Sequence, residues 1–262
     1  MKGSMIQKPP KSVKQSDKST LPYNRIVIKA GTNVLTNNSS TLDSSIISAL
    51  VSQIAEIKTL GVQVVLVTSG AIGAGRQELR NIADSGGTPA RQILAAIGQS
   101  ILMHSYQEQF SQSNIVVAQA LLTRRDLEDR QGYLNIRNTL EGLLHLGVIP
   151  VINENDVVNV EEILTEGFGD NDQLSALVAN LIEADFLLIL TDSGGLYTAD
   201  PHRNKNAQLV PLVEEINDSV LAQVEKTQSE SSKGGMYSKL MAAKFATSCG
   251  ITVVFAPGVV PD

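Results

Sequence analysis

Two lysines that lie far apart in the sequence each stand where an ammonium group could hold phosphate. Lys29 ends an otherwise apolar segment and is followed closely by Gly31. Lys239 lies just inside a predicted helix, after Lys233 and the glycine pair 234–235. An ammonium group that leaves water needs an anion, and glycine lets the backbone approach a phosphate. Together the lysines are typical of a phosphate clamp, although Lys29 alone fits a lysine that reaches for solvent equally well.

Acidic, amide and hydroxyl side chains follow several apolar segments. They gather with glycines in four segments, 29–33, 68–71, 153–156 and 191–195. A further acidic turn, Gly169-Asp170-Asn171-Asp172, lies outside these four segments. Asp170 and Asp172 stand at the start of a predicted helix, where either could cap the helix, bind Mg²⁺ or attract an ammonium group. Turn chemistry explains any one of these segments, but four of them indicate a binding site.

Histidine and cysteine are scarce. His104, His145 and His202 lie outside these segments, and Cys249, the single cysteine, is predicted to be a small buried residue of a helix. Without His-Glu-x-x-His or Cys-x-x-Cys spacing, zinc hydrolysis and serine-type acyl transfer lose their usual ligands or base. Phosphoryl transfer stays open, and a carboxylate acceptor with a pKa of about 4.3 needs no base at pH 7.

The segment 69–75 reads SGAIGAG between a predicted strand and a helix. It differs from the dinucleotide-binding G-x-G-x-x-G pattern, and without a Gly-Lys pair the chain has no Walker A loop. Backbone N–H groups there could hold an anion. Tight packing of a helix on a sheet is the favoured interpretation.

Short β-branched segments alternate with longer amphipathic ones, which is typical of an α/β protein. Strands are predicted at 25–31, 62–68, 115–122, 147–152, 186–191 and 251–255, and helices at 43–60, 90–111, 130–146, 172–184 and 235–248. Continuous apolar strands are covered on both faces, so we expect a three-layer αβα sandwich with a mostly parallel central sheet. Ligands bind such sheets at the carboxyl ends of the strands.

The composition limits the function classes. The 262 residues are 42% hydrophobic and 18% charged, with a net charge of −6, 4% aromatic residues and no tryptophan. This balance indicates a packed globular protein and argues against a nucleic-acid partner. We expect a cytoplasmic protein without a membrane span. Residues 1–22 carry five lysines and one aspartate and are expected to form a flexible basic tail, followed by one domain over 23–262.

Several longer stretches carry a resemblance to a known family. They are VIKAGTNVLT (27–36), LVTSGAIGAGR (66–76), AAIGQS (95–100), QALLTRRDLEDRQGYLN (119–135), IPVINENDVV (149–158), FGDNDQLSA (168–176), LLILTDSGGLYTADP (187–201) and GGMYSKLMAAK (234–244). On these motifs the chain resembles the glutamate 5-kinases of the amino acid kinase family. The resemblance implies the carbamate kinase-like fold and ATP-dependent phosphorylation of the side-chain carboxylate of L-glutamate, the first step of proline biosynthesis.

The resemblance also implies residue roles. Lys29 and Lys239 would stabilise the transferred phosphoryl group, and Asp172 would hold both lysines. The glutamate site would comprise Ser69, Gly70, Asn153, Asp156, Asp170 and Asn171. The ATP site would comprise Lys29, Gly31, Thr191, Asp192, Lys233, Gly234, Gly235, Met236, Tyr237, Ser238 and Lys239. Mg²⁺ would be carried by the ATP phosphates, with no metal ligand from the protein.

Alternatives stay open at this stage. They are another enzyme of the same fold, acting on N-acetylglutamate, aspartate, carbamate or a nucleoside monophosphate, and a metabolite sensor without catalysis. A homo-oligomer is expected, with a face for it on 90–111 and 130–146, and proline is a candidate inhibitor. The chain departs from the family at Ser232-Lys233, where Gly-Thr is common, and stops at Asp262 without the PUA domain of many relatives.

Overall fold

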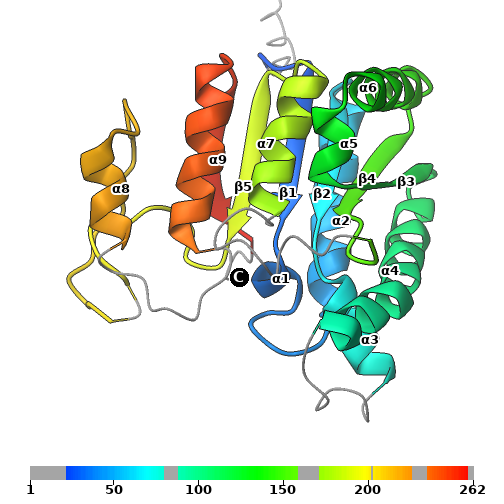
Figure 1. Ribbon diagram of the computed structural model, residues 1–262, viewed down its shortest axis with the longest axis horizontal. Coiled ribbons are helices and arrows are strands. Elements are labelled where there is room, and N and C mark those ends of the chain that lie inside the picture. The colour runs from blue at the N-terminus through cyan, green and yellow to red at the C-terminus, as the bar shows by residue number, and fades with distance from the viewer. Residues whose placement is uncertain (1–21, 80–87, 159–170, 202, 226–234, 259–262) are drawn as a thin grey trace, which may run out of the picture.

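The computed structural model describes residues 22–79, 88–158, 171–201, 203–225 and 235–258. The strands in these ranges are β1 (Arg25–Ala30), β2 (Gln63–Thr68), β3 (Val117–Leu122), β4 (Ile149–Glu154), β5 (Phe186–Thr191) and β6 (Thr252–Pro257). The helices are α1 (Thr32–Leu35), α2 (Ser44–Thr59), α3 (Ala71–Glu78), α4 (Thr88–Ser111), α5 (Arg124–Glu128), α6 (Arg130–His145), α7 (Asn171–Leu181), α8 (Asp218–Glu225) and α9 (Met236–Ser248). Figure 1 shows their arrangement.

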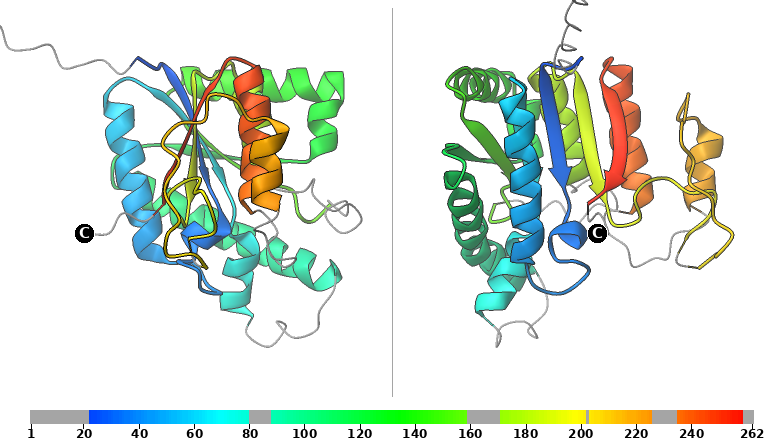
Figure 2. Two further views of the ribbon diagram at one scale, coloured as in Figure 1. Left: turned by 90° about the vertical axis from the view of Figure 1, so that its left-hand side faces the viewer. Right: turned by 180° about the vertical axis from the view of Figure 1, so that it is seen from behind.

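The strands form one sheet in the order β3-β4-β2-β1-β5-β6. Every pairing among them is parallel, so the sheet is more regular than the mostly parallel sheet that the sequence predicts. The arrowheads of the strands therefore meet at one side of the sheet, at the lower side in Figure 2. We call this side the carboxyl edge, and the opposite side the amino edge.

Helices cover both faces of the sheet, which confirms the three-layer αβα sandwich. Helices α2 and α4 pack on one face in a core cluster that includes Ile28, Ile54 and Leu102. Helices α6, α7 and α9 pack on the other face in a second cluster that includes Val27 and Leu181. Figure 1 shows α7 and α9 in front of the sheet, and Figure 2 shows α2 over the opposite face. None of the described helices is long and apolar enough to span a membrane.

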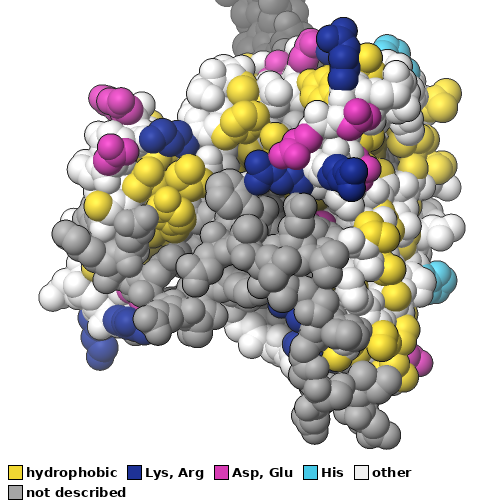
Figure 3. All heavy atoms as spheres, viewed as in Figure 1, with side chains coloured by type: hydrophobic (Ala, Val, Ile, Leu, Met, Phe, Trp, Pro, Cys, Tyr) yellow, Lys and Arg dark blue, Asp and Glu magenta, His cyan; other side chains and the backbone are white. Residues whose placement is uncertain are grey.

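The sequence located the long helices within a few residues but missed several short ones. Helix α7 ends at Leu181 rather than at 184, because the chain turns at Glu183, which has a φ of 52°. The helices α1, α5 and α8 were not predicted, and α3, expected to follow the segment 69–75, begins within it at Ala71. Helix α8 packs on α9 through a third cluster that includes Leu221 and Leu240, and Figure 3 shows hydrophobic side chains between these two helices.

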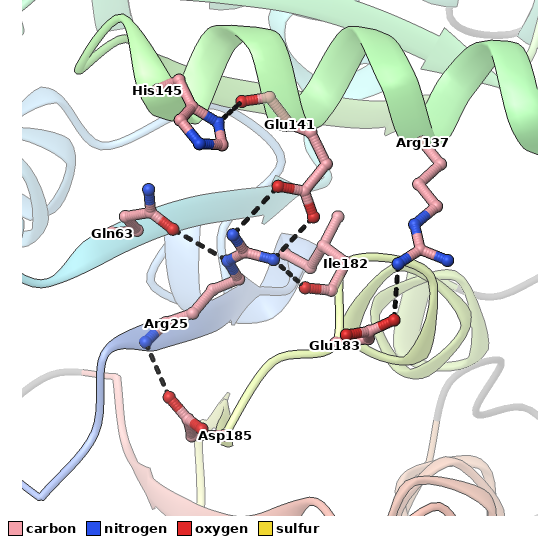
Figure 4. A network of polar contacts seen from close by, with 8 residues as sticks. All are labelled: Arg25, Gln63, Arg137, Glu141, His145, Ile182, Glu183 and Asp185. Atoms are coloured by element: carbon pink, nitrogen blue, oxygen red, sulfur yellow. Dashed lines mark hydrogen bonds and ion pairs between the residues drawn. The ribbon is translucent and has the colours of Figure 1, made fainter.

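Arg25 joins four elements at the amino edge (Figure 4). Its guanidinium group donates to both carboxylate oxygens of Glu141 on α6, at 2.7 and 3.1 Å, and to Gln63 Oε1 at the start of β2, at 2.9 Å. It also donates to the carbonyl oxygen of Ile182, directly after α7. A two-pronged ion pair of this kind is directional, so it fixes α6 and the end of α7 against β1.

Two glycines allow α3 and α4 to pack in close contact beside the carboxyl edge. A Cβ atom on Gly75 would lie 2.0 Å from the Leu94 carbonyl oxygen, and one on Gly98 would lie 1.7 Å from the Ala71 carbonyl oxygen. Neither distance leaves room for a side chain. The glycine run that starts at Ser69 thus serves packing, as expected, but against another helix rather than against the sheet.

Two glycine substitutions test this contact. We expect Gly98→Ala to lower the free energy of unfolding by about 1–3 kcal/mol or more, because the new methyl group collides with backbone atoms of α3. Gly142→Ala is the matched control: a Cβ atom on that α6 glycine meets nothing within 4 Å. It should raise the free energy of unfolding by about 0.5–1 kcal/mol. Urea denaturation measures both, and equal effects of the two substitutions would contradict the close contact.

Candidate active site

Asp172 binds both predicted lysines at the carboxyl edge. Its Oδ1 atom lies 2.5 Å from Lys29 Nζ, and its Oδ2 atom lies 3.2 Å from Lys239 Nζ. The Asp172 side chain is fully buried, and the Lys29 and Lys239 side chains are only 4% and 12% exposed. Two ammonium groups on one carboxylate leave a net positive charge, which is what a phosphate group requires.

The three elements that carry this triad are positioned by the fold. Val27 of β1 packs in the cluster under α7 and α9, and side chains two residues apart share a strand face, so Lys29 points toward the same helices. Asp172 lies in the first turn of α7 and Lys239 in the first turn of α9. An unpaired carboxylate at this depth would be strongly unfavourable. Both lysines therefore stabilise Asp172 as much as it positions them.

Gly31 leaves room for the Lys29 ammonium group. A Cβ atom on Gly31 would lie 2.9 Å from Lys29 Nζ, closer than real Cβ contacts. Its φ of −83° is open to any residue, so a side chain here would crowd the ammonium group rather than strain the backbone. A phosphate group that binds Lys29 can consequently also approach the backbone at Gly31.

An amide cluster lies next to the triad and contains three of the residues expected to bind glutamate. Asn171 directly precedes Asp172, and its Nδ2 atom donates to Ser69 Oγ at 2.8 Å and to Asn153 Oδ1 at 3.1 Å. Asn153 at the end of β4 is 2% exposed. Gly70 adopts a φ of 103°, which favours glycine, and begins α3 directly after Ser69. Two consecutive residues of α7 thus join the lysines to this cluster.

The remaining predicted site residues differ in burial and in position along the chain. Asp156 is half-buried in the turn after β4. Thr191 is buried at the end of β5, and Asp192 is exposed, with its Oδ2 atom 3.2 Å from Asn33 Nδ2. Ser238 Oγ in the first turn of α9 is buried and has no hydrogen-bond partner within the described ranges. Gly235, Met236 and Tyr237 begin or precede α9 and are half-buried, whereas Asp170, Lys233 and Gly234 lie outside the described residues.

The sequence reasoning gave no role to two further contacts. Gln99 of α4 accepts a hydrogen bond from Asn153 Nδ2 at 2.8 Å. The fully buried hydroxyl group of Tyr106 lies 2.8 Å from Thr68 Oγ1, directly before Ser69, and burial raises the pKa of this tyrosine. The position of Gln99 directly after Gly98, in the motif AAIGQS, was the available signal for the first contact. The second leaves no mark in the sequence.

The prediction for Cys249 was wrong. This cysteine is exposed, because it caps the C-terminus of α9 where the helix meets solvent. Among the described residues, no group of three or more His, Cys, Asp or Glu side chains could hold a metal ion.

Comparison with known proteins identifies relatives. The model of the amino acid kinase family matches residues 24–256. A glutamate 5-kinase of Dehalococcoides mccartyi is 52% identical over 242 residues, which are 92% of this chain and 64% of the relative. A glutamate 5-kinase of Clostridium acetobutylicum is 46% identical over 235 residues, which are 90% of this chain and 87% of the relative. The chain thus spans less than two thirds of the length of the first of these relatives.

Two solved structures share the fold at low sequence identity. Carbamate kinase from Giardia lamblia bound to AMP-PNP has a TM-score of 0.61 and 17% identity, over 90% of this chain and 94% of that chain. UMP kinase from Bacillus anthracis has a TM-score of 0.59 and 18% identity, over 92% of this chain and 90% of that chain. These structures support the αβα architecture.

One substitution tests the buried triad. We expect Asp172→Asn to lower the free energy of unfolding by about 3 kcal/mol, because it leaves the Lys29 ammonium group buried without a counter-charge. Asp192→Asn, at an exposed position of the same edge, should change it by less than about 0.5 kcal/mol. Chemical denaturation of both variants makes the comparison. Similar losses in the two variants would contradict the triad.

Proposed function

The chain belongs to the amino acid kinase family, and we propose that it transfers the γ-phosphoryl group of ATP to the side-chain carboxylate of L-glutamate. The observation that carries the proposal is the pair of ammonium groups, Lys29 and Lys239, on the single buried carboxylate of Asp172. The relatives that are named glutamate 5-kinase support the choice of acceptor. The product is an acyl phosphate, glutamyl 5-phosphate.

The reaction needs no catalytic base. A carboxylate oxygen of glutamate attacks the γ-phosphorus atom, a new P–O bond forms, the bond to the β,γ-bridging oxygen breaks, and ADP leaves. No proton moves, because a side-chain carboxyl group with a pKa of about 4.3 is ionised at pH 7. The protein has to align the two reactants and neutralise the charge of the transferred group.

Lys29 and Lys239 supply that neutralisation. Asp172 cancels one of their two charges, so the triad keeps one positive charge at a position shielded from water. Charge that develops on phosphoryl oxygens is stabilised more strongly there than in water. Asp172 holds both ammonium groups in place before the nucleotide binds, and this lowers the reorganisation that the reaction requires.

We assign the remaining nucleotide contacts to the end of β5 and the start of α9. Helix α9 begins after Gly235, which has no side chain to cap its first N–H groups, and such helix ends favour phosphate. The buried Ser238 Oγ atom is a further group for the nucleotide. Thr191, the last residue of the strand next to β1, and Asp192, directly after it, would contact another part of ATP.

Magnesium is expected to enter with the nucleotide. Asp172, the fully buried carboxylate of this edge, is already bonded to two ammonium groups and fits a metal ion poorly. We therefore propose that Mg²⁺ is held by the ATP phosphates, where it supplies further neutralisation of charge.

Three further parts of the proposal concern the protein as a whole. We propose that it forms a homo-oligomer, that proline inhibits it and that it acts in the cytoplasm.

A product-trapping assay tests the function. With ATP, Mg²⁺ and L-glutamate, the protein should release ADP and form an acyl phosphate that hydroxylamine converts to the hydroxamate. N-acetylglutamate, aspartate and carbamate, offered separately, should give far less ADP. Glutamate-independent ADP release, or turnover with one of the other acceptors alone, would contradict the proposal.

Substitutions separate the two halves of the site. We expect Lys29→Ala and Lys239→Ala each to lower kcat by roughly a hundredfold or more, because these groups stabilise charge in the transition state. Asp156→Ala should mainly raise the KM for glutamate, because we assign this carboxylate to the substrate ammonium group. Steady-state kinetics at saturating ATP gives both constants. A kcat loss in Asp156→Ala together with KM changes in the lysine variants would reverse these roles.

A further inference from the structure

A chain of four side-chain amides runs from the edge strand of the sheet to the candidate acceptor site. Asn171 Nδ2 donates to Asn153 Oδ1 at 3.1 Å, and Asn153 Nδ2 donates to Gln99 Oε1 at 2.8 Å. Gln99 Nε2 then donates to Gln119 Oε1 at 3.1 Å. The four residues come from α7, β4, α4 and β3. Every hydrogen bond in the chain points in the same direction.

A backbone group fixes this direction. The N–H of Glu154 lies 2.8 Å from one side-chain atom of Asn153, and a backbone N–H can only donate. That atom must therefore be Oδ1, which leaves the Nδ2 atom of Asn153 to face Gln99. Gln99 must then present its oxygen to Asn153 and its nitrogen to Gln119.

The orientation of Asn171 follows from that of Asn153. Both hydrogens of Asn171 Nδ2 are used, one by Ser69 Oγ and one by Asn153 Oδ1. A reversed Asn171 would place two carbonyl oxygens against each other. Its Oδ1 atom is buried and has no hydrogen-bond partner in the part of the chain that the structure describes. A buried carbonyl oxygen without a donor is unfavourable, so this atom is ready to accept a hydrogen bond from a ligand.

We propose that Gln99 is a positioning residue that selects an acceptor with a free ammonium group. Gln99 holds the Asn153 amide, Asn153 holds the Asn171 amide, and Asn171 Oδ1 is thereby kept available for the ammonium group of glutamate. This inference rests on the proposed function. It adds a reason why the protein should prefer glutamate to glutarate, the same dicarboxylate without the amino group.

Loss of Gln99 should disturb this orientation, because Asn153 is almost inaccessible to water, with 2% exposure. Its Nδ2 atom would lose its acceptor, whereas the reversed amide would set Nδ2 against the N–H of Glu154, which can only donate. Neither orientation would then be fully hydrogen-bonded, so the Asn153 amide would no longer be held in one position. Asn171, which donates to Asn153 Oδ1, would lose its fixed partner, and its Oδ1 atom would no longer be held toward the acceptor site.

The backbone of Gln99 is held firmly enough for this task. The preceding residue, Gly98, makes the close contact with the Ala71 carbonyl oxygen. Two turns earlier on α4, Gln92 Nε2 donates to the Val157 carbonyl oxygen at 3.1 Å, in the turn after β4. Helix α4 is therefore bonded both to Asn153 and to the segment that follows it.

Titration calorimetry with L-glutamate and with glutarate tests the inference in the presence of an ATP analogue. Gln99→Met keeps the length of the side chain and removes both polar atoms. We expect it to lower the ratio of glutarate Kd to glutamate Kd by roughly tenfold, mostly through weaker glutamate binding. Gln99→Glu keeps an acceptor for Asn153 and should retain most of the ratio. Gln107→Met, at an exposed glutamine of α4, is the matched control and should leave the ratio unchanged.

Two results would overturn the inference. One is a wild-type protein that binds glutamate and glutarate equally well. The other is a Gln99→Met protein that keeps the wild-type ratio, even if it binds both ligands less tightly, because a purely structural defect weakens both alike. Should Gln99→Met not fold, Gln99→Ala carries the same expectation. Binding is measured without turnover, so failure of the hydroxamate assay would count against the proposed function alone.

Discussion

The candidate site depends on one interaction, the ion pairs of the buried Asp172 carboxylate with Lys29 and Lys239. A fully buried carboxylate costs several kcal/mol unless cations neutralise it, and here the end of β1 and the first turn of α9 supply one ammonium group each. The same strand also holds the other end of α7, because Arg25 donates to the carbonyl oxygen of Ile182. Two cations of β1, at the carboxyl and amino edges of the sheet, thus fix α7 along the strand. Their spacing makes the geometry of the candidate site a direct result of how this helix packs.

The position of Asn171 next to Asp172 connects the two halves of the chemistry. In the proposed reaction, Asp172 would hold positive charge for the phosphoryl group, and Asn171 joins Ser69 and Asn153, which we assign to the acceptor. One turn of α7 would therefore set the distance between the two proposed reactants. Since the proposed acceptor is already ionised, alignment and charge would be the main demands on the protein. The scarcity of histidine in the sequence is consistent with such a reaction.

Much of the fold was predictable because its strands are continuous apolar segments that can only be buried, as in RIVIKA of β1 and FLLILT of β5. The start of helix α3 was misplaced because AIGAGRQE contains two glycines and has little intrinsic tendency to form a helix. Its contact with α4 creates it, and that contact is invisible in the local sequence. The predicted burial of Cys249 was wrong for a related reason. The apolar residues around it did not show that α9 ends directly before this cysteine.

The site itself was only partly predictable. Lys29 was selected because a cation at the end of an apolar strand needs an anion. From the sequence alone, a Lys29 side chain that reaches solvent was an equally good interpretation. The pairing of both lysines with Asp172 was implied by the family resemblance, and the structure bears out this contact. Gln99 lies within a recognised motif, yet its contact with Asn153 depends on how closely α4 approaches the sheet. Such long-range geometry cannot be derived from residue types or spacing.

The most direct test of whether Lys29 and Lys239 act on the same phosphoryl group is the affinity of the protein for a transition-state analogue. Calorimetry would compare the binding of ADP alone with that of ADP plus aluminium fluoride, in the presence of Mg²⁺ and L-glutamate. If Lys29 and Lys239 both contact the transferred phosphoryl group, Lys29→Met and Lys239→Met should each weaken the binding of ADP plus aluminium fluoride far more than the binding of ADP alone. If either substitution weakens both binding affinities equally, the lysines do not act together on that group and the account is wrong.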